Sequence, residues 1–311
     1  MTGIGYHPAF LEHRTGPRHP ENPQRLTAIM RRLEASNLLE KLHSLEAAPA
    51  SREAITAVHT PSYMADIEDQ CNTGRMFRPD DDTVASPGTF TAACLAAGTC
   101  LAAADAVLQG KVRNAFCPVR PPGHHALPDH AMGFCFFNNV AITARHLQKV
   151  HGLSRIAIVD WDVHHGNGTQ DIFLQDPSVF YFSIHQFPLY PGSGRASETG
   201  EGPGRNFTLN IPLRSGAGDA EAERAFHQEL RPAMDRFKPE FLLVSAGFDG
   251  HRDDPLGGLV MTADGYANLT RQVMEMADKH CEGRLVSILE GGYNLEALAA
   301  SVEAHIRILL D

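Results

Sequence analysis

The segment from Asp160 to His165 (DWDVHH) carries the residue types that bind metal ions. Asp162 and His164 are two residues apart, so in an extended chain both side chains point to the same side and can share one cation. Asp249 follows another apolar run and could add a carboxylate oxygen, leaving a position open for water as in catalytic zinc sites. Such an oxygen-rich set also admits iron, manganese or cobalt. From the residues alone, a polar network under a loop, with Asp249 as a helix cap or turn residue, stays open.

Two further motifs carry groups suited to proton transfer and to stabilising an oxyanion. His124 and His125 in RPPGHHA are imidazoles, which suit general acid and base work near neutral pH. Tyr293 in EGGYN follows two glycines that allow a tight turn and leave its ring free to donate a hydrogen bond to a developing oxyanion. The alternatives are a histidine pair in a surface loop and a tyrosine packed at the end of the last strand.

Six short apolar runs alternate with helix-like stretches and predict buried parallel strands. Helices are expected to begin at Asn22-Pro23, Ser86-Pro87, Asp219 and Thr262, and Pro232 should kink or break the third of them. The alternation predicts an α/β fold with a single domain over residues 1–311, whose parallel sheet is covered by helices on both faces. The six runs are NAFCPV (114–119), RIAIVD (155–160), VFYFSI (179–184), NFTLNIPL (206–213), FLLVSA (241–246) and LVSILE (285–290).

The segments that hold the candidate metal ligands and proton-transfer groups follow four of these runs. RPPGHH, DWDVHHGNG, AGFDGH and EGGYN each come directly after an apolar run. Because ligands of open parallel sheets bind beyond the carboxyl ends of the strands, the four segments are expected to meet in one crevice. The Gly-rich stretch 191–206 lies between two predicted strands and is expected to form one long surface loop. Its glycines resemble a phosphate-binding fingerprint only weakly, because no helix follows and no lysine is placed as in a P-loop.

The composition restricts the kinds of partner and compartment that we expect for this protein. The 311 residues include 27 Lys and Arg against 37 Asp and Glu, a net charge of -10, and no basic run, which argues against direct nucleic-acid binding. The six cysteines are scattered without a CxxC pair, which indicates reduced thiols in a cytoplasmic protein. The N-terminus has no signal-like pattern, and we expect no apolar run long enough to span a bilayer and no membrane partner.

Seven motifs in a fixed order carry a resemblance to a known family. They are HPENPQR (19–25), RPPGHHA, GFCFFNN, DWDVHHGNG, SIHQ, AGFD and EGGYN, and together they span most of the chain. With these motifs the chain resembles the histone deacetylases, which share the arginase-type α/β fold with about eight mainly parallel strands between helices. The resemblance implies a zinc-dependent amidohydrolase that removes the acetyl or a related acyl group from acyl-lysine.

The resemblance also implies roles for the residues of the site. One zinc ion would be held by Asp162, His164 and Asp249, where it polarises the amide carbonyl and activates a water. His125 resembles the general base and acid, His124 its electrostatic partner, and Tyr293 the oxyanion donor. Asp160 should orient His124. One branch of the family has an aspartate that faces the second histidine. Asn167 stands at that position in this chain, and an asparagine there is similar to the class II branch.

Further residues are implied for the substrate tunnel and for structural ions. Gly133, Phe134 and Tyr190 resemble the walls of a tunnel for an acylated lysine. Leu256 stands where polyamine-preferring relatives can carry a glutamate, and so favours an uncharged stem. Structural potassium ions are expected at two places. One would lie by Asp160, Asp162, His164, Ser183 and Ile184, and the other near Phe173, Asp176, Val179 and Phe207.

Three alternatives compete with an acyl-lysine deacetylase. The first is an acetylpolyamine or other small-molecule amidohydrolase of the same fold. A binuclear manganese ureohydrolase fits less well, because one Asp-x-His and one further Asp suit a single metal. A non-catalytic acyl sensor would keep the metal ligands, but the presence of His124, His125 and Tyr293 argues for turnover.

Overall fold

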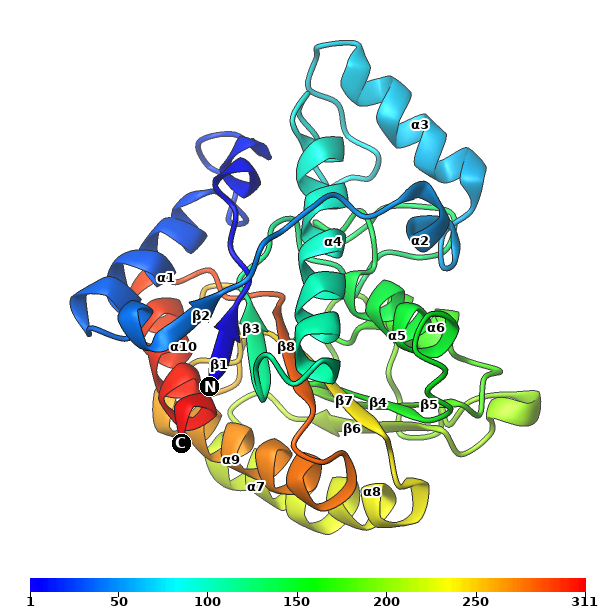
Figure 1. Cartoon of the computed structure of the whole chain (residues 1–311), viewed down its shortest axis with the longest axis vertical. Coiled ribbons are helices and arrows are strands. Elements are labelled where there is room, and N and C mark those ends of the chain that lie inside the picture. Colours follow the sequence, from blue (N-terminus) through cyan, green and yellow to red (C-terminus); the bar gives the residue numbers. More distant parts are fainter.

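A computed structural model describes residues 1–311, which form one eight-stranded sheet (Figure 1). Every strand pair is parallel, and the strand order is β2-β1-β3-β8-β7-β4-β5-β6. The strands are β1 (Thr2–Ile4), β2 (Leu42–Ser44), β3 (Asn114–Cys117), β4 (Ile156–Asp160), β5 (Val179–Gln186), β6 (Thr208–Leu213), β7 (Phe241–Ala246) and β8 (Leu285–Leu289). The predicted α/β class and parallel sheet are confirmed.

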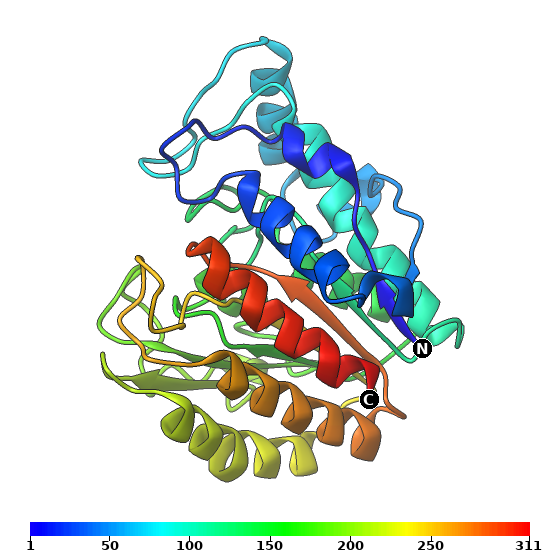
Figure 2. The ribbon, with the colours of Figure 1, turned by 90° about the vertical axis from the view of Figure 1, so that its left-hand side faces the viewer.

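Helices cover both faces of the sheet. On one face α1, α10, α9 and α7 pack in a row, with α8 beside α9 (Figure 2). On the other face α4 and α5 pack against each other and against the central strands, and α2, α3 and α6 lie around them (Figure 1). The helices are α1 (Gln24–Ala35), α2 (Arg52–Thr56), α3 (Pro61–Asn72), α4 (Thr89–Leu108), α5 (Asn139–Lys149), α6 (Asn167–Ile172), α7 (Asp219–Ala225), α8 (Arg231–Phe237), α9 (Ala263–His280) and α10 (Leu295–Leu310).

All six strands predicted from apolar runs are present, as β3 to β8. Every residue of β3, β4, β7 and β8 is buried, because helices cover both faces of these strands and leave no room for alternation. The two strands without a predicted run, β1 and β2, have three residues each, and β2 is an edge strand with exposed residues. Such short segments carry no periodicity to detect.

The predicted helix starts are right to within three residues. Thr262 is the N-cap of α9, and its hydroxyl accepts a hydrogen bond from the Gly265 N–H at 3.0 Å. Asp219 begins α7 as predicted. The expected starts at Asn22 and Ser86 lie two and three residues before the first residues of α1 and α4. Pro23 alone separates Asn22 from α1, whereas Pro87 and Gly88 separate Ser86 from α4.

Pro232 interrupts the third predicted helix in the expected region. A single π-helical turn, Phe226–Leu230, separates α7 from α8, and Pro232 lies at the start of α8. Proline has no N–H to donate and its ring clashes with the carbonyl of the preceding turn. The widened turn immediately before it accommodates the missing bond, so the helix continues in two pieces.

Helix α4 corrects the expectation that no apolar segment is long enough to cross a bilayer. Its 20 residues are long and apolar enough by length and composition. Most of the helix is buried inside the protein, where it contacts α5, β3 and β8. A central core helix is apolar all round for the same reason as a membrane helix, because no side faces water.

The cysteines and the Gly-rich segment can both be compared with what the sequence led us to expect, and only the Gly-rich segment departs from it. All six cysteines are buried and unpaired, as expected for reduced thiols. The Gly-rich segment does connect β5 to β6. It is not wholly a surface loop, because Gly194 is buried and its carbonyl contacts His185 Nε2 at 2.8 Å.

Buried His59 anchors the connection between α2 and α3 to the start of α5. Its Nδ1 donates to the Leu127 carbonyl at 2.9 Å, and its Nε2 accepts the Asn138 N–H at 2.9 Å. A proton on Nε2 would break the second bond. Burial lowers the pKa of His59 to about 4, even though its backbone partners oppose the shift.

This pKa shift predicts that acid destabilises the protein through His59. Between pH 6.5 and pH 4 the unfolded chain binds a proton that the folded ring rejects, so the free energy of unfolding falls by up to about 1.4 kcal/mol per pH unit. His59→Gln keeps an acceptor and a donor without ionising. We expect the free energy of unfolding, measured with urea, to fall by about 2 kcal/mol less between pH 7 and pH 5 in the variant than in the wild type. The same change at exposed His43 is the control, and equal slopes in His59→Gln and wild type would contradict the prediction.

Candidate active site and metal centre

Four adjacent strands carry the predicted site residues. β3, β8, β7 and β4 are neighbours in that order, and RPPGHH, EGGYN, AGFDGH and DWDVHHGNG follow their carboxyl ends. Because parallel strands end at the same edge, these segments meet above the middle of the sheet. The expected convergence of four strand ends is therefore confirmed.

The three predicted metal ligands lie together at this edge. His164 Nδ1 is 3.0 Å from Asp162 Oδ1 and 3.1 Å from Asp249 Oδ2. Backbone N–H groups hold the other oxygens, with Gly291 donating to Asp162 Oδ2 at 2.8 Å and Val163 to Asp249 Oδ1 at 2.9 Å. One nitrogen and two carboxylate oxygens thus face a common point.

The charges of this cluster fit a divalent cation. Asp162 and Asp249 are buried with a single imidazole between them. Burial and the charge of Asp162 raise the pKa of Asp249 to about 7, and the two carboxylates overcome burial to raise the pKa of His164 to about 10. The cluster therefore attracts positive charge strongly, and a cation would take the place of the His164 proton. Gly291 leaves the space, because a Cβ there would lie 2.0 Å from Asp249 Oδ2.

The two adjacent histidines have different partners. His124 Nδ1 lies 3.0 Å from Asp160 Oδ2, whereas His125 Nδ1 donates to Asn167 Oδ1 at 2.7 Å. Burial disfavours charge on both rings, but Asp160 and Asp162 overcome it and raise the pKa of His124 to about 10. Burial and the neighbouring His124 hold the pKa of His125 well below its ordinary value. The pair therefore combines a charged imidazole with a neutral one, which is able to accept a proton.

Asp160 and Asn167 lie where the sequence placed them. Asp160 contacts His124, and its Oδ2 also accepts the Tyr181 hydroxyl at 3.0 Å, a partner that the sequence did not reveal. Asn167 is the first residue of α6, directly after the DWDVHHG turn. Its amide gives His125 a neutral hydrogen-bond acceptor, so the imidazole is oriented without a full negative charge.

A cavity of about 250 Å³ is lined by His125 and His164. The four predicted substrate-contacting residues all line it, together with Tyr293 and two residues that were not predicted. The predicted four are Gly133, Phe134, Tyr190 and Leu256, and the other two are Asp82 and Leu189.

Gly133 and Phe134 are shaped by the close approach of the chain to His125. Both have positive φ, +55° at Gly133 and +68° at Phe134. A Cβ at Gly133 would lie 2.4 Å from the His125 ring, so only glycine lets this loop close over the imidazole. The Phe134 ring then lies edge-on to Tyr293, with 5.8 Å between ring centroids.

Tyr293 reaches the cavity as expected from the two glycines before it. Its backbone N–H donates to Asp254 Oδ2 at 2.6 Å, and the Arg25 guanidinium lies over its ring at 5.0 Å. Burial and the charge of Asp249 raise the pKa of Tyr293 well above its ordinary value. The phenol therefore keeps its proton and can donate it in a hydrogen bond.

Three supporting residues were not assigned from the sequence. Buried Glu290 accepts the N–H groups of Gly123 and His124 through Oε2, at 2.7 and 3.1 Å. Asp254 accepts two N–H groups at the start of α10, and buried Arg25 donates to the Gly292 carbonyl at 2.7 Å. Arg25 and Glu290 stand inside motifs that the sequence singled out, HPENPQR and EGGYN, and their charged side chains within these motifs were the available signal.

The potassium sites stay predictions. In the first set, Asp160 and Ser183 are partners across β4 and β5. In the second set, Phe173 is the C-cap of α6, Val179 begins β5, and Phe207 immediately precedes β6. The Phe173 and Phe207 carbonyls each already accept one backbone N–H, and a carbonyl keeps a second lone pair for an ion.

The chain is similar to known proteins over most of its length. The family model of the histone deacetylase domain matches residues 19–309. The chain is 45% identical over 298 residues to a probable deacetylase of Archaeoglobus fulgidus, covering 95% of this chain and 82% of that protein. It is 40% identical over 277 residues to the histone deacetylase-like amidohydrolase of Pseudomonas aeruginosa, with 89% and 73% covered.

Two further comparisons also extend over nearly all of this chain. The crystal structure of the HDA15 HD domain superposes with a TM-score of 0.95 at 38% identity, covering 99% of this chain and 89% of that one. The human polyamine deacetylase HDAC10 is 42% identical over 301 residues, which is 93% of this chain and 44% of that protein. The matches extend over nearly all of the sequence and its fold, and the chain belongs to the histone deacetylase family of amidohydrolase enzymes.

Proposed function

We propose that this protein is a zinc-dependent deacetylase that hydrolyses the amide of acetyl-lysine, or of a related acyl-lysine, in a peptide. The observation that carries the proposal is the position of neutral His125, Tyr293 and His164 of the ligand cluster at one cavity. Bound zinc, held by Asp162, His164 and Asp249, would supply Lewis acidity toward the amide carbonyl and the attacking water.

His125 and His124 divide the proton chemistry. The Nδ1–H of His125 is fixed on Asn167, so its Nε2 is free to take the proton of the attacking water and later to give it to the leaving amine. His124 keeps its proton through Asp160, and its positive charge stabilises the negative charge that develops nearby. Tyr293 donates its phenol hydrogen bond to the developing oxyanion.

The cavity walls favour a slender apolar stem. Phe134, Leu189, Tyr190 and Leu256 line the cavity, and these side chains match the methylene chain of a lysine better than a charged amine. Six unpaired cysteines and the net charge of -10 further support action in the reducing cytoplasm, with no nucleic acid as a direct partner.

An acetylpolyamine is the second candidate substrate, and one observation favours it. Asp82 also lines the cavity and is half-buried there, so a carboxylate is present that could attract a distal ammonium. The similarity to a relative named polyamine deacetylase points the same way. Leu256 favours the peptide instead, because it leaves uncharged the position at which polyamine-preferring relatives can carry a glutamate.

The test compares kcat/KM of zinc-reconstituted protein for an acetyl-lysine peptide and for an acetylated polyamine. We expect the peptide to be preferred, and chelation to abolish both reactions until zinc is restored. Leu256→Glu should raise the polyamine-to-peptide ratio about tenfold, because a carboxylate at the wall would pair with the distal ammonium. Leu256→Gln is the matched uncharged control. A wild-type preference for the polyamine would refute the peptide assignment, and no turnover of either would refute the enzyme class proposed.

A further inference from the structure

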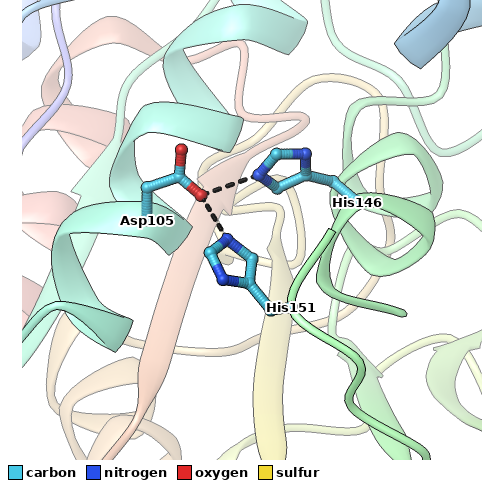
Figure 3. A group of neighbouring side chains, drawn as sticks. All are labelled: Asp105, His146 and His151. Atoms are coloured by element: carbon cyan, nitrogen blue, oxygen red, sulfur yellow. Dashed lines mark hydrogen bonds and ion pairs between the residues drawn. The ribbon is translucent and has the colours of Figure 1, made fainter. Parts of the chain in front are cut away.

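A second cluster of metal-ligating side chains lies away from the catalytic cavity (Figure 3). Asp105 is in the last turn of α4, His146 is in the last turn of α5, and His151 follows just after that helix. Both imidazoles point their Nε2 at the same oxygen, Asp105 Oδ1, and each nitrogen is 2.7 Å from it. Three potential ligand atoms therefore converge on one point.

The topology separates this cluster from the catalytic centre. α4 leads into β3, and α5 leads into β4, so both helices end at the amino edge of the sheet. The catalytic residues lie beyond the carboxyl ends of the same strands. A ligand at one edge cannot contact the residues of the other.

The donor set suits a divalent transition metal. Two imidazole nitrogens and one carboxylate oxygen are the ligands that zinc and its neighbours bind, whereas calcium and magnesium prefer oxygens alone. Metal ligands in a tetrahedral site lie about 3.3 Å apart, so the 2.7 Å contacts need to open by about 0.6 Å when an ion takes the place of the bridging protons. Small side-chain rotations achieve this opening. Each ring would carry its remaining proton on Nδ1.

Exposure and charge also fit an ion that enters from solvent. The side chains of Asp105, His146 and His151 are 36, 14 and 24% exposed, so they are held by the protein and yet reachable. Asp105 has no Lys or Arg as an ion-pair partner, only these two imidazoles. The two rings lie edge-on, with 5.2 Å between centroids and 75° between planes, so neither ring blocks the other's nitrogen. Open coordination positions would face water.

We propose that Asp105, His146 and His151 form a second metal site that binds zinc or a similar divalent transition-metal ion and fastens the end of α4 to the end of α5. An ordinary hydrogen-bonded Asp-His-His cluster would give the same contacts without metal affinity. Zinc stoichiometry distinguishes the two, and it does so without reference to deacetylase activity.

The experiment measures zinc bound to the whole chain by equilibrium dialysis and elemental analysis. We expect two equivalents for wild type, one for His146→Ala/His151→Ala, and one for Asp249→Ala, which removes a ligand of the other site. Asp105→Asn keeps the side-chain shape and should weaken the second equivalent at least tenfold. His280→Ala is the matched control, because His280 Nε2 also pairs with one carboxylate, Asp235 Oδ1 at 2.8 Å.

Thermal unfolding provides the second readout. Excess zinc should raise the Tm of Asp249→Ala, in which only the second site remains, and should leave Asp249→Ala/His146→Ala/His151→Ala unchanged, because an ion bound only by the folded state stabilises it. A single equivalent in wild type that Asp249→Ala abolishes would overturn the proposal. So would a second equivalent that survives in both His146→Ala/His151→Ala and Asp105→Asn. If the double variant does not fold, Asp105→Asn against wild type decides the question.

Discussion

Replacing His125 with alanine is expected to lower kcat by about 10²–10⁴-fold, the range that a positioned general base contributes. The imidazole is buried at the cavity, its Nδ1 is held by Asn167, and burial together with His124 keeps it neutral. No neighbouring group has these three properties, because the ring of His124 is held charged by Asp160. The measurement is kcat on an acetyl-lysine peptide with zinc content determined on the same sample.

The control for this prediction is His130→Ala. His130 belongs to the same loop but is exposed, and its Nδ1 pairs with Asp129 at 2.8 Å. Its removal should change kcat by less than threefold. A His125→Ala protein that retains both zinc and more than a tenth of the wild-type kcat would show that another group moves the proton.

A change in pH dependence would identify His125 as the base more directly. Asn167→Asp places a negative charge on the Nδ1 side of His125, which favours the protonated ring and raises its pKa. The base must be neutral to act, so the acidic limb of the kcat/KM profile should move to higher pH in this variant. An unmoved limb in the Asn167→Asp protein would separate His125 from the titrating base.

Tyr293→Phe is expected to lower kcat by about 10²–10³-fold, the usual effect of removing one oxyanion donor. The phenol lines the cavity together with His125 and His164, and its raised pKa keeps it protonated. Phenylalanine retains the packing against Phe134 and the contact with Arg25. Zinc content and KM should therefore stay near their wild-type values, and the loss should lie in kcat.

Tyr190→Phe is the matched control for this loss. Tyr190 lines the same cavity but is 38% exposed at its wall, so removing its hydroxyl should change kcat by less than tenfold. The comparison also separates an enzyme from a sensor, since both would hold the metal. If Tyr293→Phe hydrolyses the peptide as fast as wild type, the phenol has no part in catalysis.

The sequence predicted the convergence of the four strand-end segments because their residues stand at the ends of buried apolar runs. Runs such as RIAIVD and LVSILE are apolar on both faces, so the polar residues after them had to lie at the edge of the sheet. The order of β3, β8, β7 and β4 did not follow from the residues, yet parallel pairing alone placed all four ends on one side.

The residues that the sequence missed act through backbone groups or over long separations. Glu290 and Asp254 bind N–H groups of distant loops, which no motif spacing records. Asp105 and His151 are separated by 46 residues and meet only because α4 and α5 pack side by side. Short strands such as β1 carry too few residues for any periodicity.

The position of β8 has a consequence for biosynthesis. This strand comes after all the others in sequence, yet it lies in the centre of the sheet between β3 and β7. A nascent chain that ends before residue 285 can form only two separate half-sheets, each with a bare central edge, and bare edges pair with other chains. Closure of the sheet, and with it the meeting of the four strand-end segments, must therefore wait until β8 has been synthesised and can insert between β3 and β7.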